Sequence, residues 1–360
     1  MQAFKREKVM MIARRRFLKT LCLFPFVARL PGIAESQSIP DFSELKSGFA
    51  RRLKKILTTG TLPYIDIESS CNSSIVNIDA IAQSMDRLNI GLMALSADID
   101  RDQYNKGMRF DNLSERLVTR YPDRFIPVGN GGQPPALTEA PIEFLDAQEK
   151  AADNKAIMLL GEFEFRHYPS SRQIRRSQPD RDVRIPIDGA TGHRLFSLSE
   201  QRSLAFQIHY ELEDELFKPL EKMLAQYPKA KIIWCHLAQI RYIERASRYT
   251  PAYLDELIRR FPNLYFDTAF GDANTIYPLS KQRHNRIWAS PGSIKSEWRE
   301  LIIAHPRRFL SALDLGQDRI NQITGYDNNH RIFLKQLPAE TQHQVAYRNT
   351  WLLLFNEEFT

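Results

Sequence analysis

The sequence predicts a (β/α)8 barrel, or TIM barrel, formed by a single domain with long loops after its fourth and seventh strands. Three observations support this prediction. Eight short apolar segments typical of strands occur along the chain, and amphipathic helical segments separate most of them. The alternation extends over about 290 residues, which suits a barrel domain. No glycine-rich phosphate-binding motif follows any strand, so a doubly wound open sheet is only the second choice.

One strand–helix–strand segment, Ala205–His236, shows the repeating unit most clearly. Its two apolar runs end in His209 and His236. Between them, apolar residues recur every three or four positions over Leu212–Leu224, which predicts a helix. Two strands joined by a helix are parallel, so both histidines are expected at the same, C-terminal edge of the sheet. Functional sites of barrels are built at this edge.

The remaining elements follow the same alternation along the chain. Strands are predicted at Leu62–Ile67, Ile90–Ser96, Arg124–Val128, Ala156–Phe165, Ala205–His209, Lys231–His236, Asn263–Thr268 and Arg308–Asp314. Helices are predicted at Ile75–Leu88, Leu113–Tyr121, Ile142–Ala152, Leu212–Leu224, Tyr253–Arg260, Ile294–Ala304 and Glu340–Phe355. The barrel domain is thus assigned to residues 62–360, and residues 35–61 form a lead-in segment with a basic helical piece around Phe49–Leu57.

The excess of positive charge belongs to the N-terminus. The chain carries a net charge of +7, but residues 1–34 contain eight lysines and arginines and a single acidic residue, so the remainder is neutral. Binding to nucleic acid therefore loses its main support.

The same N-terminus predicts export. Arg14–Lys19 matches the twin-arginine motif, and an apolar stretch and the small residues of Gly32–Ala34 follow it. We therefore expect a signal peptide at residues 1–34, passage through the twin-arginine translocase, and a periplasmic or otherwise exported protein. The apolar stretch is too short for an ordinary membrane span, so none is expected in the mature chain. The alternative is a basic amphipathic helix lying on a membrane surface.

Polar residues stand near the ends of several predicted strands, where a buried strand is expected to be apolar. In strand one, Asp66, Glu68 and Ser70 share a face because side chains alternate along a strand. The others are Glu162 and Glu164 in strand four, His209 in strand five, His236 in strand six and Asp314 in strand eight. A lone histidine at a strand end is usually structural, but the agreement among these strands predicts a site. Asp267, which ends strand seven, is a weaker signal, and the alternative is that it only orients a loop.

The cysteines predict no disulfide framework. Cys235 precedes His236 on a strand and should therefore point into the apolar layer. Together with Cys71 it is expected to be a buried thiol, even in an oxidising compartment.

Over roughly residues 62–355 the chain resembles the amidohydrolase superfamily, in particular its metal-dependent hydrolases. The resemblance is carried by the segments Tyr64–Ile67, Phe206–Glu211, Ile232–Leu237, Trp298–Gly316 and Leu337–Thr350. In that family strand one carries Asp-x-His-x-His, strands five and six one histidine each, and strand eight an aspartate. Together these residues bind one or two divalent metals, usually zinc.

The resemblance implies roles by position. His209 would be a metal ligand, His236 a second ligand or a catalytic residue, and Asp314 a ligand that also accepts a proton. Glu68 and Ser70 stand in the places of the two strand-one histidines. Some decarboxylases of the superfamily use glutamate at the first place, whereas serine is a weak ligand. We therefore expect one divalent metal, zinc or alternatively manganese, with ligands drawn from Glu68, His209, His236, Asp314 and, at the strand-four place of a bridging carboxylate, Glu162.

The chemistry implied by this resemblance is hydrolysis. A divalent metal lowers the pKa of a bound water to about 7, which makes hydroxide available at neutral pH. Asp314 would orient this water and take its proton, while the metal and His236 polarise the bond under attack.

A long connection, Arg166–Arg194, follows strand four and contains seven arginines. Long loops on the catalytic face are often functional, so one of two equal interpretations is that this loop folds over the mouth of the site and binds an anionic substrate through guanidinium groups. Arg166 and His167 come directly off the strand and are expected to contact the substrate. The alternative is a solvated insertion without a function.

Three functions remain open. The first is an exported metal-dependent hydrolase acting on a small, anionic ester, lactone or amide. The second is a non-oxidative decarboxylase of the same fold, which Glu68 favours and the export signal disfavours. The third is a barrel that has lost its strand-one histidines and binds a ligand without catalysis. Metal content separates the third from the others, and release of carbon dioxide separates the first two.

Overall fold

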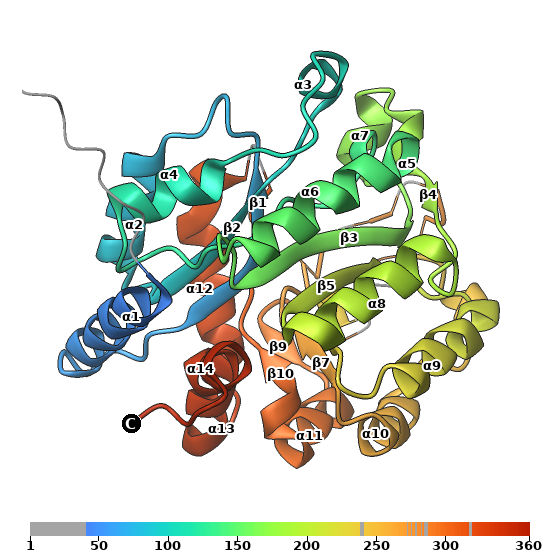
Figure 1. Ribbon diagram of the computed structural model, residues 1–360. Helices are drawn as coiled ribbons and strands as arrows, with labels where there is room; N and C mark the ends of the chain where they lie inside the picture. Colours follow the sequence, from blue (N-terminus) through green and yellow to red (C-terminus); the bar gives the residue numbers. More distant parts are fainter. Residues whose placement is uncertain are drawn as a thin grey trace, which may run out of the picture. The chain divides into compact units, whose positions relative to one another are not determined.

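The computed structural model is an eight-stranded parallel barrel with helices around it (Figure 1). It describes residues 41–237, 241–271, 273–274, 276–277, 279–281, 283, 287–316 and 319–360. The signal peptide predicted at residues 1–34, and the first part of the lead-in segment, lie outside these residues.

The barrel strands pair in chain order. They are β1 (Ile65–Cys71), β2 (Leu92–Ala97), β3 (Leu159–His167), β5 (Ala205–Tyr210), β6 (Lys231–Trp234), β7 (Leu264–Asp267) and β10 (Phe309–Leu310). The third position is an extended segment, bridged to β2 through Phe125 and to β3 through Val128. The barrel closes between its first and last strands, where Ile67 N donates to Ser311 O at 3.0 Å and Ser69 is bridged to Leu315. The TIM-barrel prediction is therefore confirmed.

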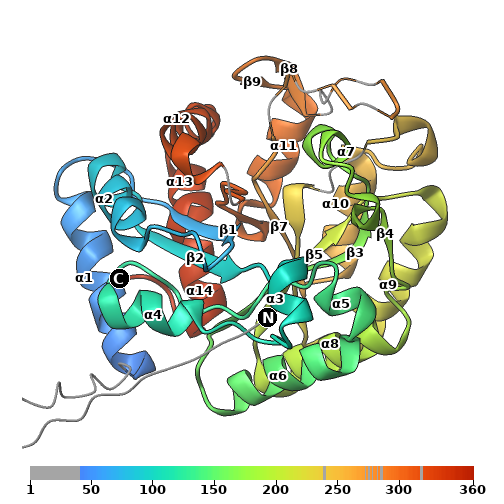
Figure 2. The same cartoon turned by 90° about the horizontal axis from the view of Figure 1, so that it is seen from above.

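Helices form a ring outside the strands (Figure 2). The longer ones are α1 (Phe42–Leu57), α2 (Ile78–Leu88), α4 (Leu113–Arg120), α6 (Pro141–Asp153), α8 (Ala190–Arg202), α9 (Phe217–Gln226), α10 (Pro251–Arg260), α11 (Ser296–Ala304), α12 (Ile323–Leu334) and α14 (Asn349–Phe355). Shorter ones are α3 (Arg101–Asn105), α5 (Ala136–Glu139), α7 (Ser171–Arg175) and α13 (Ala339–His343). The helical piece expected in the lead-in is α1, which begins earlier than the sequence predicts because Asp41 and Glu44 form a capping box.

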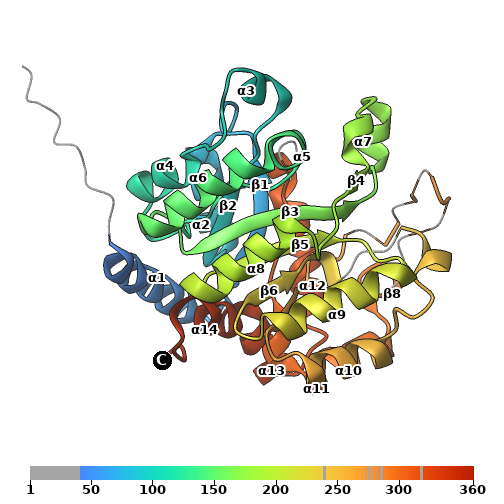
Figure 3. The same ribbon diagram turned by 45° about the vertical axis from the view of Figure 1, so that its right-hand side comes forward.

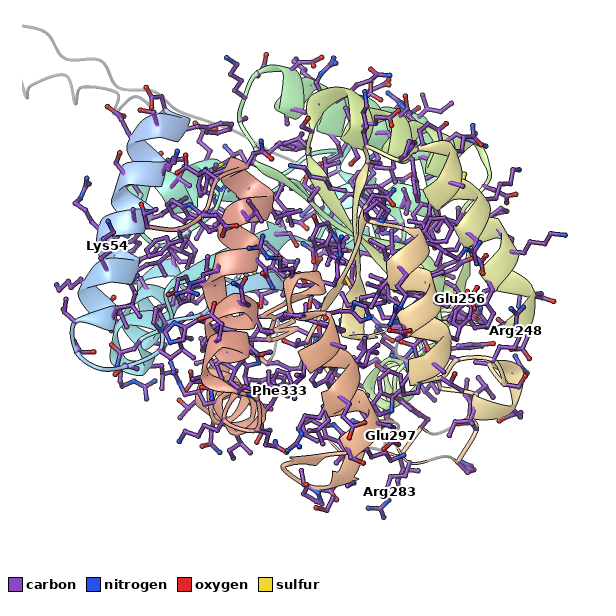
Figure 4. The ribbon with its side chains drawn as sticks, turned by 90° about the horizontal axis from the view of Figure 1, so that it is seen from below. Lys54, Arg248, Glu256, Arg283, Glu297 and Phe333 are labelled. Carbon is purple, nitrogen blue, oxygen red and sulfur yellow. The ribbon has the colours of Figure 1, made fainter. Side chains whose placement is uncertain are left out.

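The longer helices each bury one face and expose the other. Lys54 of α1, Glu256 of α10 and Glu297 of α11 are exposed, whereas Phe333 of α12 is buried (Figure 4). The same amphipathic pattern predicts α1, α10 and α11 from the sequence, whereas α12 was not predicted.

Stacked aromatic rings fill part of the layer between strands and helices. Trp234, Phe266 and Phe309 come from the neighbouring strands β6, β7 and β10, with successive ring centroids 5.9 and 5.7 Å apart. All three rings are fully buried. Their packing holds β6, β7 and β10 in place, and residues at the ends of these strands line the site. Cys71 and Cys235 are free and buried, as predicted. None of the described helices is long and apolar enough to cross a membrane.

Two long connections leave the C-terminal ends of the strands, as predicted. The first follows β3 and contains α7, a 3-10 turn at Pro179–Arg181 and β4 (Val183–Arg184), which pairs antiparallel with the end of β3 (Figure 3). The second follows β7 and contains the antiparallel pair β8 (Trp288–Ser290) and β9 (Ser293–Ile294).

Candidate metal centre

A polar cavity of about 430 Å³ lies at the C-terminal end of the barrel. Strand-end residues from both halves of the chain line it, among them Ser70, Glu162, Glu164, His209, His236 and Asp314. The cavity therefore stands where the alternation of strands and helices predicts a site.

Glu162, His209 and His236 meet at the floor of this cavity. Glu162 Oε1 lies 2.9 Å from His209 Nδ1 and 3.1 Å from His236 Nε2, and the two histidine nitrogens lie 3.2 Å apart. Each residue offers a metal-ligating atom within 4.8 Å of the others. Because β3, β5 and β6 are parallel neighbours, residues from their ends can converge on one point.

In the absence of a metal, the carboxylate and the imidazoles of this group shift each other's pKa toward the charged form. Burial alone would raise the pKa of Glu162, but its hydrogen bonds to His209 and His236 lower that pKa well below its usual range. Burial alone would lower the pKa of His209, but Glu162 and Glu211 raise it to about 10. A cation that binds to this carboxylate must displace the protons of the two imidazoles, because only neutral imidazole is a metal ligand.

His167 extends the same group on the other side of His209. His209 Nε2 lies 3.1 Å from Glu211 Oε1, and His167, His209 and Glu211 again place ligating atoms within 4.8 Å of one another. Burial lowers the pKa of His167 well below its usual range. Arg241 donates to the same Glu211 oxygen at 2.7 Å. His167 lines the cavity.

Asp314 is placed in the cavity but is engaged by an arginine. Its two carboxylate oxygens accept hydrogen bonds from Arg319 at 2.9 and 2.6 Å. Among the described residues it belongs to none of the groups with metal-ligand spacing. The five predicted ligands therefore do not form one cluster.

Glu68, like Asp314, does not belong to the group formed by Glu162, His209 and His236. It joins His236 and Asp267 in a group whose ligating atoms lie within 4.8 Å of one another. Burial, and then the charge of Asp314, raise the pKa of Glu68 well above its usual range. The structure places Asp267, which is a weak signal in the sequence, beside Glu68 and His236.

Arg166 does not line the cavity, which corrects the prediction that it faces a substrate there. The register between β3 and β5 shifts between Glu164 and Arg166, and this irregularity interrupts the alternation of side chains. The guanidinium of Arg166 therefore bonds to Glu213 at 2.6 Å and to Asp182 at 2.8 Å. His167 takes the place at the cavity.

Three arginines that line the cavity each have one unused hydrogen-bond donor among the described residues. Arg181 binds Glu164, Arg241 binds Glu211 and Arg319 binds Asp314. In each of these three the buried Nε atom has no hydrogen-bond partner among the residues that the structure describes. Unsatisfied cationic donors in a buried pocket favour an anionic ligand. Arg181, Arg172 and Arg176 come from the long loop after β3, so this loop reaches the cavity, as expected.

The backbone is strained where it enters the site. His236, Leu237 and Asp314 have φ angles of 62°, 43° and 52°, which non-glycine residues rarely adopt. Such conformations persist where surrounding structure enforces them, and they concentrate at functional sites.

Comparisons with known proteins place the chain by fold alone. No family model matches it, and no curated protein matches its sequence significantly. Solved structures of similar fold include a 2,6-dihydroxybenzoate decarboxylase complexed with 2,6-dihydroxybenzoate, with 11% identity and a TM-score of 0.51 over 82% of this chain and 99% of that chain. A dihydroxybenzoic acid decarboxylase from Polaromonas sp. JS666, with bound manganese and the inhibitor 2-nitroresorcinol, shows 13% identity and a TM-score of 0.51 over 82% and 98%. A protein named amidohydrolase II shows 13% identity and a TM-score of 0.51 over 81% and 99%.

Proposed function

We propose that this chain is a metal-dependent enzyme of the amidohydrolase superfamily that hydrolyses an ester, lactone or amide of a small anionic substrate. The observation that supports this most strongly is the convergence of Glu162, His209 and His236 at the C-terminal edge of the barrel, with ligating atoms within 4.8 Å of one another. The shared barrel fold of the amidohydrolase and decarboxylase structures gives further support.

The same three side chains fit a divalent metal. One carboxylate oxygen and two imidazole nitrogens form a donor set that suits zinc and also manganese. A metal held by Glu162, His209 and His236 would supply a Lewis acid and a water of lowered pKa. Zinc is our first choice for this chain, and manganese, which is bound in the similar decarboxylase from Polaromonas, is the second.

The cavity arginines would hold the substrate. Arg181, Arg241 and Arg319 each keep a buried Nε donor without a partner, and all three line the cavity. A substrate carboxylate that accepts from such donors is fixed in position and is paired with positive charge. His167, beside His209, provides a further polar contact at the same wall.

Asp314 is the proposed proton acceptor. When a substrate anion takes over part of the hydrogen bonding of Arg319, an oxygen of Asp314 is released to accept the proton of the attacking water. Substrate binding and activation of the base are thereby coupled through one guanidinium group. His236 is the second proposed catalytic residue: as a ligand it would act through the metal, which would polarise the bond under attack.

A decarboxylase is the second candidate function. Glu68, in place of a strand-one histidine, favours it, and two of the structures of similar fold are named decarboxylases. Release of carbon dioxide from a carboxylated substrate, without uptake of water, would replace the first proposal with the second. A barrel without catalytic activity is the remaining alternative and would bind no metal.

We also propose that the protein is exported through the twin-arginine translocase. Arg14–Lys19 and the sequence that follows it support this. Fractionation of cells that produce the full chain tests it, with a variant in which Arg14, Arg15 and Arg16 are changed to lysine as the control. An unchanged distribution in this variant would remove the proposal.

Metal content is the decisive measurement. The full chain is stripped with a chelator, reloaded with zinc or manganese, and measured by elemental analysis. We expect Glu162→Gln and His209→Ala to lose about one equivalent of metal that the wild type holds. The matched control is His305→Ala, because His305 contacts Asp255 away from the cavity. No metal in the wild type, or the same amount in all variants, would exclude this metal centre.

A further inference from the structure

A second cavity, of about 470 Å³, lies at the N-terminal end of the barrel. Helix α1 forms one wall, and the residues that lead into β2 and into the third barrel position form the other. This cavity shares no residue with the cavity of the metal centre. Figure 1 shows α1 on the opposite side of the barrel from α7, which belongs to the loop at the metal centre.

Positive charge exceeds negative charge in this second cavity. Two carboxylates face four cationic side chains there, and the six residues are Asp86, Asp123, Arg51, Arg52, Lys55 and Arg124. Both carboxylates are already paired. Asp86 binds Arg52 at 2.8 Å and Arg124 at 2.9 Å, and Asp123 binds Arg124. Among the described residues, Arg51 and Lys55 therefore line the cavity without an acidic partner.

These two cations stand next to each other on the helix. Arg51 and Lys55 are four residues apart in α1, so their side chains lie on the same side, about one turn apart. Like charges at this spacing repel each other and weaken a helix. An anion bound between the two side chains would turn this repulsion into attraction.

Arg52 adds a fixed, buried cation to the same wall. Its side chain is only 9% exposed, and its guanidinium donates to Gly91 O at 2.7 Å and to Ile90 O at 3.0 Å. Burial lowers the pKa of Arg52; the hydrogen bond to Asp86 opposes this shift, and the charge of Arg124 adds to it. Further negative charge beside Arg52 would therefore stabilise its charged form.

We infer that this cavity binds the phosphate group of a phosphate monoester, with Arg51 and Lys55 as its main contacts. Such a group carries about 1.5 to 2 negative charges at pH 7 and three acceptor oxygens, which suits two unpaired cations. A guanidinium group binds phosphate through two parallel hydrogen bonds, and an ammonium group binds it as a point charge. A single carboxylate would leave one of the two cations without a partner. The side-chain amide of Asn89, which also lines the cavity, adds a neutral donor.

The cavity has room for more than the phosphate group. Its volume of about 470 Å³ lies within the range of small-molecule sites, roughly 300–1,000 Å³, so the organic part of the ester also fits. The ester is either a soluble molecule or the headgroup of a lipid such as phosphatidic acid. In both cases the ligand would tie α1 to the barrel, because the cavity walls belong to both. This site does not depend on the metal centre or on the reaction catalysed there.

The first experiment measures binding of glycerol 3-phosphate to the metal-free full chain by titration calorimetry. We expect saturable binding to the wild type and about 10–100-fold weaker binding to Arg51→Gln/Lys55→Gln, because charged hydrogen bonds are lost. Lys54→Gln is the matched control, since Lys54 is exposed on the same helix and does not line the cavity (Figure 4). Arg241→Gln should retain this binding, which excludes the cavity of the metal centre as the site measured.

The second experiment distinguishes the two sources of the phosphate group. Phosphatidylcholine vesicles with and without phosphatidic acid are sedimented with the wild type and with the double variant. Binding of glycerol 3-phosphate assigns a soluble ester. Sedimentation of the wild type alone, and only with phosphatidic acid, assigns a lipid if glycerol 3-phosphate does not bind.

Thermal unfolding separates loss of the ligand from loss of the fold. Both substituted residues are exposed, so the double variant without ligand should melt within a few degrees of the wild type. Glycerol 3-phosphate or phosphatidic acid vesicles that bind the wild type and the double variant equally would overturn the inference. Binding of neither probe to the wild type would overturn it as well.

Discussion

Both carboxylate oxygens of Asp314 accept hydrogen bonds from Arg319, at 2.9 and 2.6 Å. The residue that the sequence assigns as metal ligand and proton acceptor is therefore neutralised by a guanidinium group five residues further along the chain. Arg319 retains a buried Nε donor, so it can bind a second anion at the same time. If the substrate is an anion, as proposed above, this arrangement would link its binding to the hydrogen bonding of Asp314.

Asp314→Asn should retain the fold and lose hydrolysis. An amide cannot accept the proton of water, and a general base contributes about 10²–10⁴-fold to the rate, so kcat should fall by that factor. Activity is measured on a panel of small carboxylate-bearing esters and lactones, and the fold by circular dichroism. Asp98→Asn, an equally conservative change in the same cavity, is the control and should lose far less. Unchanged turnover in Asp314→Asn would remove Asp314 from the mechanism.

Arg241→Gln should weaken the binding of anionic substrates. It removes a charged donor from a buried position, so KM for the best ester of the panel should rise about 10–100-fold, with a smaller change in kcat. Arg241→Lys keeps the charge beside Glu211 and should fall between the wild type and Arg241→Gln. Arg194→Gln serves as the control, because Arg194 pairs with Asp146 and Glu149 outside the cavity. A KM that does not respond to Arg241 would exclude it from the binding site.

Arg166→Met should affect stability and leave substrate binding unchanged. Arg166 is buried beside Glu213 and does not line the cavity, so its loss leaves a buried carboxylate short of a partner and should cost roughly 3 kcal/mol in the free energy of unfolding. Arg184→Met is a matched control, because Arg184 binds the same carboxylate from a half-exposed position and should cost less than about 1 kcal/mol. Urea unfolding measures both. A rise in KM without a loss of stability would restore the role that the sequence suggested for Arg166.

His330 should make the protein sensitive to acid. Burial lowers the pKa of His330 to about 3, and its Nε2 lies 2.8 Å from the Ser311 hydroxyl. Because the unfolded chain takes up this proton near pH 6.5 and the folded chain only near pH 3, the stability contributed by neutral His330 is complete above pH 6.5. It is lost as the pH falls from 6.5 toward 3.

The corresponding variant is His330→Gln, which keeps a polar group beside Ser311 and cannot become charged. Relative to the wild type, it should gain about 3 kcal/mol in the free energy of unfolding between pH 7 and pH 4. Urea titrations of both proteins at the two pH values measure this difference. If both proteins lost the same free energy of unfolding between pH 7 and pH 4, groups other than His330 would cause the acid sensitivity.

The sequence predicts the barrel well because parallel strands that are buried on both faces must be apolar along most of their length. Residues that break this rule, such as Glu162, His209 and His236, therefore stand out, and the structure brings these three together. No comparable signal marks Arg241 or Arg319. They come from connections after the strands, where apolar periodicity carries no information about which side chain turns inward.

Local backbone irregularities account for the errors at the site. The register shift before Arg166 exchanges the places that strict alternation gives to Arg166 and His167. The left-handed conformation of His236 turns the chain where the sequence predicts a continuing strand. Two of the longer helices, α8 and α12, were missed because polar residues and a glycine interrupt their apolar stripes.

The closure of the barrel has a consequence for the time course of synthesis. Asp66 Oδ1, in the first strand, accepts from Leu313 N at 2.9 Å, a contact between residues 247 positions apart in the chain. At ribosomal speeds of about 5–20 residues per second, the first strand waits roughly 10–50 s for this partner to emerge. During that interval its edge is open to other chains, so a chaperone that shields nascent strands should raise the yield of native protein.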